Sequence, residues 1–254
     1  MSRFQEIEGG GARYGSIALR SISRFGPIGA GQEMRIREAM DHSVAQPIWS
    51  QLVGEGETFD RPRILLAGWA ARVRSLPDGR RQILSFFLPG DIFDVSLSAQ
   101  AGVAAPIVSL TRVVFARFPT IADPINLVGG GDSVSAAFRE YHRLEQVYLL
   151  NQLVRIGRQT PYERMAHLLL EFYYRLKAMG FFQGNGYVLP LTQEVLADAL
   201  ALSHVHTNRT LQQLRRDGLI ATHRSTVMLV DLPRLTQIAD FKRPFVPDRQ
   251  RCLE

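Results

Sequence analysis

One short segment of the chain carries hydrogen-bonding side chains at a spacing suited to reading the edges of DNA bases. A helix expected over residues 203–216 would place an imidazole, an amide and a guanidinium on one face beside a valine methyl. The residues of this face are His204, Val205, Asn208, Arg209 and Gln212. Guanidinium and amide groups can bind purine edges in the major groove, and a methyl group can contact thymine. The pattern therefore predicts a base-reading helix face.

A second set of residues in the same segment is suited to holding phosphates. Thr192 and Ser203 can each cap a helix, and the backbone N–H groups at a helix N-terminus attract anions. The predicted phosphate contacts are Thr192, Gln193, Ser203, His206 and Arg216. Two short helices joined by a tight turn predict a helix-turn-helix with its recognition helix at residues 203–216. Residues 220–222 and 227–230 would form a β wing beside it.

A structural alternative exists for this segment, because short amphipathic helix pairs occur in many bundles and a basic helix face is often only solvated. Local charge favours the DNA interpretation. Four arginines stand against the single acid Asp217 over residues 204–224, and they are Arg209, Arg215, Arg216 and Arg224.

The elements expected before this segment are short strands in the first half of the chain and long helices after it. Residues 69–76 and 80–88 flank Pro77-Asp78-Gly79, and Asp-Gly between two such runs predicts a β-hairpin. A further strand is expected over residues 107–118. Short strands separated by turns predict a sandwich or a jelly-roll barrel over residues 21–131. A flexible arm that contains three consecutive glycines is expected before it, over residues 1–20.

A long helix is expected over residues 132–157. One face of it is formed by Val134, Phe138, Tyr141, Leu144 and Tyr148. Further apolar residues lie around much of the circumference of the helix, namely Val147, Leu149, Leu150, Leu153, Val154 and Ile156. Such a helix needs two surfaces to bury it, and we expect the β domain and the same helix of a second subunit. The alternative is a single long core helix.

The C-terminal domain is expected over residues 158–240, followed by a C-terminal tail over residues 241–254 that is expected to be solvated after Phe241. Thr160-Pro161-Tyr162-Glu163 is typical of a capping box with proline at the first helical position. Gly180 should end this helix. Its buried stripe would be Met165, Leu168, Leu169, Phe172 and Leu176.

Composition narrows the classes of function. The formal net charge of +6 weakly favours polyanionic partners. Cys252 is the only cysteine, which excludes an intramolecular disulfide, a cysteine-rich zinc site and an iron–sulfur cluster, and fits a cytoplasmic protein. The longest uncharged run, residues 95–111, is too short for a membrane span.

His42, His142 and His167 lack the spacing of metal ligands, so no metal is expected. No catalytic triad or glycine-rich phosphate loop supports an enzyme.

Several motifs, in their order and spacing, resemble the cyclic-AMP receptor protein/fumarate–nitrate regulator (CRP/FNR) superfamily of bacterial transcription factors. They cover the chain from about residue 25 to residue 240. The matching stretches are Gly68-Trp69-Ala70-Ala71-Arg72, Leu76-Pro77-Asp78-Gly79-Arg80, Leu88-Pro89-Gly90-Asp91, Tyr162-Glu163-Arg164-Met165-Ala166, Asn208-Arg209-Thr210-Leu211 and Asp217-Gly218-Leu219-Ile220. The resemblance implies an α+β protein with an N-terminal β-roll sensor, a long dimerisation helix and a C-terminal winged helix-turn-helix. It also implies that Arg209 contacts guanine and that RNA polymerase is a partner.

Departures from the family pattern bear on the effector. Cyclic-nucleotide-binding relatives carry a Gly-Glu pair and later an arginine after the Gly-Asp turn, whereas residues 91–106 here contain no arginine and include Asp94. Oxygen-sensing relatives carry clustered cysteines. Neither cyclic AMP nor an iron–sulfur cluster is therefore expected as cofactor. Val205 stands where many relatives have a base-reading glutamate. Ala201 stands where glycine is frequent, so a slightly different or a strained backbone is expected in the turn.

These observations predict a homodimeric transcription regulator that binds an inverted repeat in double-stranded DNA. The alternative is a binding module that senses an unidentified small molecule, with DNA binding as a secondary or lost property.

Overall fold

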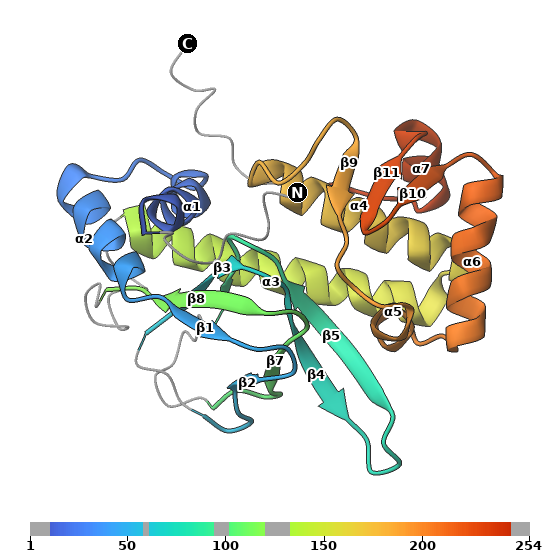
Figure 1. Cartoon of the computed structure of the whole chain (residues 1–254), viewed down its shortest axis with the longest axis horizontal. Coiled ribbons are helices and arrows are strands. Elements are labelled where there is room, and N and C mark those ends of the chain that lie inside the picture. The colour runs from blue at the N-terminus through green and yellow to red at the C-terminus, as the bar shows by residue number, and fades with distance from the viewer. Residues whose placement is uncertain (1–10, 58–60, 94–101, 120–132, 245–254) are drawn as a thin grey trace. The chain divides into compact units, whose positions relative to one another are not determined.

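The computed structural model describes residues 11–57, 61–93, 102–119 and 133–244 (Figure 1). The chain divides into two compact units. The first comprises Met1–Arg72, Phe86–Gln146 and Phe245–Glu254, and the second comprises Val73–Ser85 and Val147–Pro244. This division differs from the boundaries expected from the sequence, because the outer part of the predicted hairpin belongs to the C-terminal unit.

Among the described residues, the first unit and the β4–β5 hairpin together form two four-stranded sheets. One has the order β1-β8-β3-β6, formed by β1 (Val44–Gln46), β8 (Val113–Arg117), β3 (Arg63–Ala67) and β6 (Ile92–Phe93). The other has the order β2-β7-β4-β5, formed by β2 (Gln51–Val53), β7 (Ile107–Ser109), β4 (Ala70–Ser75) and β5 (Arg81–Phe87). Apolar side chains from strands of both sheets form one core, including Leu52, Leu65, Phe87, Ile107 and Phe115. This agrees with the predicted β-roll.

The predicted hairpin is present as β4 and β5, but the single strand predicted over residues 107–118 is wrong. This stretch forms β7 in one sheet and β8 in the other. The chain bends between β7 and β8, next to Trp69. The Trp69 carbonyl accepts hydrogen bonds from the backbone N–H groups of Leu110 and Thr111 in this bend. The Thr111 hydroxyl accepts a hydrogen bond from the Trp69 backbone N–H at 2.9 Å.

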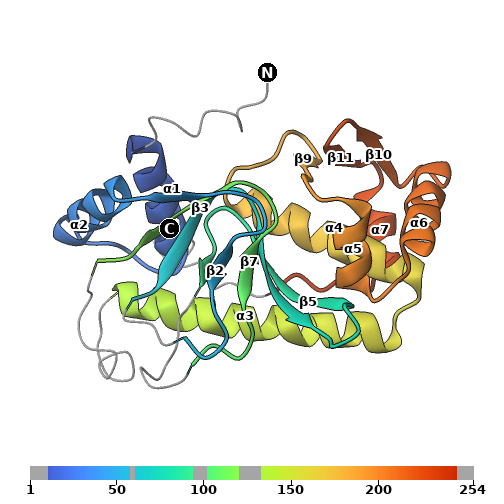
Figure 2. The same cartoon turned by 60° about the horizontal axis from the view of Figure 1, so that its bottom comes forward.

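Two helices precede the strands, and the prediction of a flexible arm up to residue 20 is wrong for the residues that the structure describes. Helix α1 (Gly11–Ser23) buries Tyr14, Ile17, Ala18 and Ile22. This spacing marks one face of an amphipathic helix, a signal that the neighbouring glycines obscured. Helix α2 (Ala30–Asp41) lies beside α1 (Figures 1 and 2). Residues 1–10 lie outside the described residues.

The long helix α3 (Ser133–Arg158) is one uninterrupted helix that contributes to both units (Figure 2). Four of the five residues predicted on its first face are buried within the first unit, and these are Val134, Phe138, Tyr141 and Leu144. Phe138 packs edge-on against Phe118 with ring centroids 5.2 Å apart. The Tyr141 hydroxyl donates to the Gly90 carbonyl at 2.9 Å. This face therefore packs on the β-roll of its own chain and is not open to a second subunit.

The second unit contains four helices and a small sheet in addition to its part of α3. Its elements are α4 (Pro161–Ala178), β9 (Gly186–Val188), α5 (Gln193–Leu200), α6 (His204–Arg216), β10 (Ile220–His223), β11 (Thr226–Leu229) and α7 (Leu232–Ile238). The predicted capping box begins α4, where Glu163 and Thr160 exchange hydrogen bonds between side chain and backbone. The five residues predicted for its buried stripe are all buried.

The first residue of the predicted C-terminal tail packs in the core of the second unit. Phe241 is buried, and its ring stacks on Tyr174 at 5.5 Å and lies edge-on to His167 at 5.0 Å. These contacts make Phe241 part of the core of the second unit. Residues 245–254, which include Cys252, lie outside the described residues.

Candidate nucleic-acid interface

Helices α5 and α6 form a helix-turn-helix, and each helix begins at the N-cap residue predicted from the sequence, Thr192 or Ser203. The Thr192 hydroxyl accepts a hydrogen bond from the backbone N–H of Val195 at 3.3 Å, and the Ser203 hydroxyl accepts one from His206 at 3.2 Å. Each cap satisfies one of the N–H groups that a helix N-terminus leaves without an intrahelical partner. The inward residues of both helices are buried, namely Val195, Leu196, Ala199, Thr207, Thr210, Leu211 and Leu214.

The opposite face of α6 is exposed and polar. His204, Arg209 and Gln212 are exposed, Asn208 is half-buried, and Val205 is 67% exposed. A valine that is two-thirds exposed gains little stability from burial in its own chain. The structure thus brings all five predicted base-reading residues to one accessible helix face, next to the basic residues Arg215 and Arg216.

The predicted phosphate contacts lie around the ends of these two helices. Thr192 and Gln193 are at the start of α5, and Ser203 and His206 are at the start of α6. Arg216 is exposed in the last turn of α6. The Ser203 and Thr192 hydroxyls act as acceptors in their caps, so each retains a hydrogen to donate to a phosphate oxygen.

The turn between the two helices contains a backbone conformation that glycine adopts more easily. Ala201 has φ 52° and ψ 46°, which is the left-handed helical region. This agrees with the strain expected at this position from the sequence. A non-glycine residue in this region costs roughly 1–2 kcal/mol.

Ala201→Gly is therefore expected to stabilise the protein by about 1 kcal/mol, because relief of the backbone strain exceeds the added entropy of the unfolded chain. Urea unfolding of both proteins would measure the change. The matched control is Ala221→Gly, in which an exposed strand residue of the wing is replaced and a loss of stability is expected. A destabilised Ala201→Gly protein would contradict the strain.

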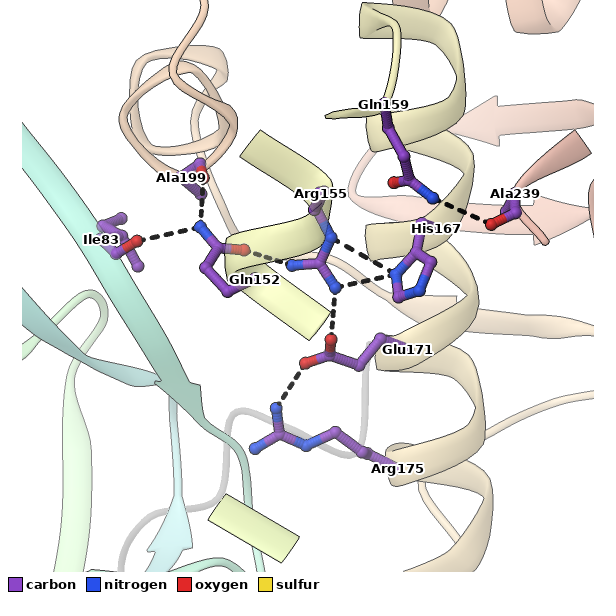
Figure 3. A network of polar contacts seen from close by, with 9 residues as sticks. All are labelled: Ile83, Gln152, Arg155, Gln159, His167, Glu171, Arg175, Ala199 and Ala239. Atoms are coloured by element: carbon purple, nitrogen blue, oxygen red, sulfur yellow. Dashed lines mark hydrogen bonds and ion pairs between the residues drawn. The ribbon is translucent and has the colours of Figure 1, made fainter. Parts of the chain in front are cut away.

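The last carbonyls of α5 accept hydrogen bonds from side chains of distant segments, and Figure 3 shows the one from Gln152 to Ala199. The Ala199 carbonyl accepts hydrogen bonds from Gln152 of α3 at 2.6 Å and from Gln82 of β5 at 3.3 Å. The Leu200 carbonyl accepts one from Arg164 of α4 at 2.8 Å. Carbonyls at a helix C-terminus lack intrahelical partners, so these donors fix the point at which α5 ends and the turn begins.

The β4–β5 hairpin adds an ion pair to the same helix. The Arg81 guanidinium lies 2.9 Å from Asp198 and 3.2 Å from Glu194, both on α5. The Gln152 side chain also donates to the Ile83 carbonyl of β5 at 3.1 Å, so one amide joins the hairpin, α3 and α5 (Figure 3). These contacts position the helix-turn-helix within the second unit.

A buried charged network lies where α3 packs on α4 (Figure 3). Arg155 is 2% exposed and donates to Glu171 at 2.5 Å, and Arg175 donates to the other oxygen of Glu171 at 2.9 Å. Arg155 also donates to His167 Nδ1 at 2.9 Å. Burial alone would raise the pKa of Glu171, but Arg155 and Arg175 together hold this pKa below its ordinary value.

The same network keeps His167 neutral. Burial, followed by the charge of Arg155, lowers the pKa of His167 from 6.5 to about 4. Since Arg155 donates to Nδ1, that nitrogen acts as an acceptor and carries no proton. This is the packed role expected for a lone histidine.

Stability should therefore fall on acidification through His167. The unfolded chain takes up this proton near pH 6.5 and the folded chain only near pH 4, so the contribution is complete above about pH 6.5 and is lost between those values, about 3 kcal/mol in all. Denaturant unfolding at pH 7 and at pH 4.5 would measure it. His167→Gln should lose less stability over this range than the wild type, whereas the exposed control His204→Gln should not. Equal losses in all three proteins would argue against the effect.

The wing is a three-stranded sheet with the order β10-β11-β9. Its predicted strands agree with β10 and β11 within one residue, and the exposed Arg224 occupies the turn with φ 51°. Sequence reasoning did not identify β9, nor did it identify Gln152, Arg155 and Glu171 as positioning residues. Polar groups inside otherwise apolar helices were the available signal for those three.

Among the described residues, no group of three or more histidine, cysteine, aspartate or glutamate side chains could hold a metal ion. Within the same part of the chain, no helix is both long and apolar enough to cross a membrane.

Comparison with known proteins extends the resemblance seen in the motifs. Residues 163–238 match the Crp-like helix-turn-helix domain family. The nitrogen fixation regulation protein FixK of Bradyrhizobium diazoefficiens is 30% identical over 185 residues, which cover 69% of this chain and 72% of that protein. The chain belongs to the CRP/FNR family of transcription regulators.

Other CRP/FNR relatives support this membership. The transcriptional activator protein FnrL of Cereibacter sphaeroides is 28% identical over 197 residues, 76% of each chain. The solved structure of FixK2 from Bradyrhizobium japonicum has the same fold, with a TM-score of 0.66 and 22% identity over 77% of this chain and 96% of that one. The α+β fold expected from the sequence is confirmed, as is the expectation of a transcription regulator with a DNA-binding helix-turn-helix and not an enzyme.

Proposed function

We propose that this CRP/FNR regulator acts as a homodimer that places two copies of α6 in successive major grooves of an inverted-repeat site. The exposed polar face of α6, positioned by two capped helix starts and a fixed turn, is the observation that carries the proposal. Arg209 would donate to guanine. His204, Val205, Asn208 and Gln212 would tune neighbouring positions, while the cap residues and Arg216 would bind phosphates.

An apolar stripe on α3 supports the dimer. Leu149, Leu150, Leu153 and Val154 are 42%, 61%, 56% and 56% exposed, at positions i, i+1, i+4 and i+5 of the helix. These residues form a seam that would be buried by the same helix of a second subunit. Tyr148, the fifth residue of the predicted face, is half-buried and lies under Arg175, whose guanidinium is 4.4 Å from its ring centroid.

We further propose that neither cyclic AMP nor an iron–sulfur cluster controls the protein. Residues 91–106 contain no arginine to neutralise a cyclic phosphate, and Asp94 would repel one. A single cysteine cannot replace the several thiolates that a cluster requires. Asp94 and Cys252 both lie outside the described residues, so these arguments come from the sequence. RNA polymerase as a partner and the cytoplasm as the location stay predictions from the family and the composition.

Two arginine variants test the division between base reading and phosphate binding. Arg209→Ala should cost about 1–3 kcal/mol of binding free energy and relax the preference at one base position. Arg216→Ala should instead weaken binding to all sequences almost equally and reduce the salt slope by roughly one unit. Fluorescence anisotropy against a panel of single-base variants of the selected site would measure both effects.

The matched control is Arg35→Ala, which removes an exposed arginine from α2 outside the interface. It should leave affinity and sequence preference nearly unchanged. Arg209 would lose its base-reading role if Arg209→Ala weakened every sequence to the same extent.

A further inference from the structure

A cavity of about 650 Å³ opens in the first unit. It lies between the end of α2 and the strands β1, β3 and β8. Its volume is in the range of roughly 300–1,000 Å³ that is typical of small-molecule sites. It is lined by Ala39, His42, Val44, Gln46, Arg61, Arg63, Phe115, Ala116, Arg117, Phe118 and Pro119.

The described lining residues of this cavity carry positive charge. Arg61, Arg63 and Arg117 contribute three guanidinium groups, and His42 contributes an imidazole. None of the lining residues just named is acidic. Guanidinium groups present planar arrays of donors that match carboxylate and phosphate oxygens.

Two of these arginines face each other across a strand pair. In the antiparallel pairing of β3 with β8, Arg63 lies directly opposite Arg117, and Leu65 lies opposite Phe115. Directly opposed residues point to the same face of a sheet, and like charges in that arrangement destabilise the pair. An anion bound between the two side chains would attract both guanidinium groups and so offset their mutual repulsion.

The cavity also offers an apolar wall and an ordered arginine. Arg63 donates to the Leu52 carbonyl at 2.6 Å, and its guanidinium lies 5.9 Å from the centroid of the Phe115 ring. Phe115 and Phe118 are both largely buried, so their positions are fixed by the core. A ligand with an apolar body could pack against this wall while its oxygens meet the arginines.

We propose that this cavity binds a small organic anion that joins a carboxylate or phosphate group to an aromatic or aliphatic body. Among the described residues of the stretch where the cyclic-nucleotide-binding relatives carry their phosphate-binding arginine, 91–93 and 102–106, none lines the cavity. Anion binding in the cavity does not depend on how the protein binds DNA.

Calorimetric titration of the full-length protein without DNA tests the proposal. The probes are phenyl phosphate and phthalate at constant ionic strength, and the tighter of the two identifies the preferred oxyanion. We expect saturable binding at one site per chain. Arg117→Gln and Arg61→Gln should each weaken it about tenfold, as expected for the loss of one charge-assisted hydrogen bond.

The matched control is Arg112→Gln, which removes an exposed arginine from the β7–β8 corner of the same unit. It should change the affinity by less than about twofold, since a screened charge outside the cavity contributes little. Without any probe, Arg117→Gln should melt at or above the wild-type temperature, because it removes the repulsion from Arg63.

Three results would overturn the proposal. These are the absence of saturable binding of both probes, unchanged binding in Arg117→Gln and Arg61→Gln, and an equal loss in Arg112→Gln. The first two would show that the cavity does not hold an anion, and the third would show only a general effect of net charge. A lower melting temperature for probe-free Arg117→Gln would contradict the repulsion between the paired arginines.

Discussion

Replacing Leu150 and Leu153 together by glutamate is expected to leave a folded monomer that binds a duplex with two half-sites about 10²–10⁴-fold more weakly than the wild type. Both side chains are more than half exposed in the single chain, so the substitutions remove no core contact within it. In the proposed dimer the same positions meet their copies on the partner helix, where four carboxylates would have to be buried together.

Sedimentation velocity and anisotropy with the two-half-site duplex would measure this effect. The wild type should sediment as a dimer and the double variant as a monomer with an unchanged helical circular dichroism spectrum. The matched control is Met34→Glu with Ile48→Glu, which places two carboxylates at apolar residues that are 62% and 53% exposed elsewhere on the chain. If the α3 variant stayed dimeric, the stripe would not be the dimer interface.

Glu171→Gln is expected to lower the free energy of unfolding by about 3–5 kcal/mol. Glu171 is 4% exposed and is the carboxylate shared by Arg155 and Arg175. The amide keeps the shape of the side chain but removes its charge, so two buried guanidinium groups lose their counter-ion. Urea unfolding at pH 7 would measure the loss.

The control for this substitution is Glu33→Gln, which breaks an exposed i, i+4 pair with Arg37 at 2.8 Å. Pairs of that kind contribute about 0.3–0.5 kcal/mol. A loss in Glu171→Gln no larger than in this control would contradict the view that the buried network holds α3 on α4.

The helix-turn-helix could be predicted from the sequence because its signals are local. Thr192 and Ser203 each bond to a backbone N–H three residues ahead, so the residue type and its position are sufficient to predict the cap. The strain at Ala201 could also be predicted, since the family resemblance pointed to a glycine there and the structure has φ 52°. The base-reading roles of the α6 residues stay predictions until DNA binding is measured.

The contacts that hold this motif in place could not be predicted in the same way, because they join distant parts of the chain. Gln152 is 69 residues from Ile83 and 47 residues from Ala199, and only the folded chain brings their carbonyls to one amide. The surface that covers each face of α3 could not be predicted for the same reason. Apolar residues around the circumference of the helix predicted two covering surfaces, but the pattern did not show that the face from Val134 to Leu144 packs on the β-roll of its own chain.

The opposition of Arg63 and Arg117 in neighbouring strands is a further arrangement that could not be predicted from the sequence. The two residues are far apart in sequence, and β8 was predicted only as part of a longer strand that also contained β7. Their opposition depends on the register of β3 with β8, which the alternation of side chains did not reveal.

Selection from random duplex DNA tests most directly whether the chain reads DNA as a two-fold symmetric dimer through α6. The purified full-length protein would be incubated with a random duplex library, and the retained sequences would be determined. The account predicts a motif of two inverted half-sites whose centres are about one helical turn apart, with the preference at one guanine in each half-site relaxed in Arg209→Ala. Recovery of a single asymmetric half-site, or no enrichment by a folded dimer, would contradict it.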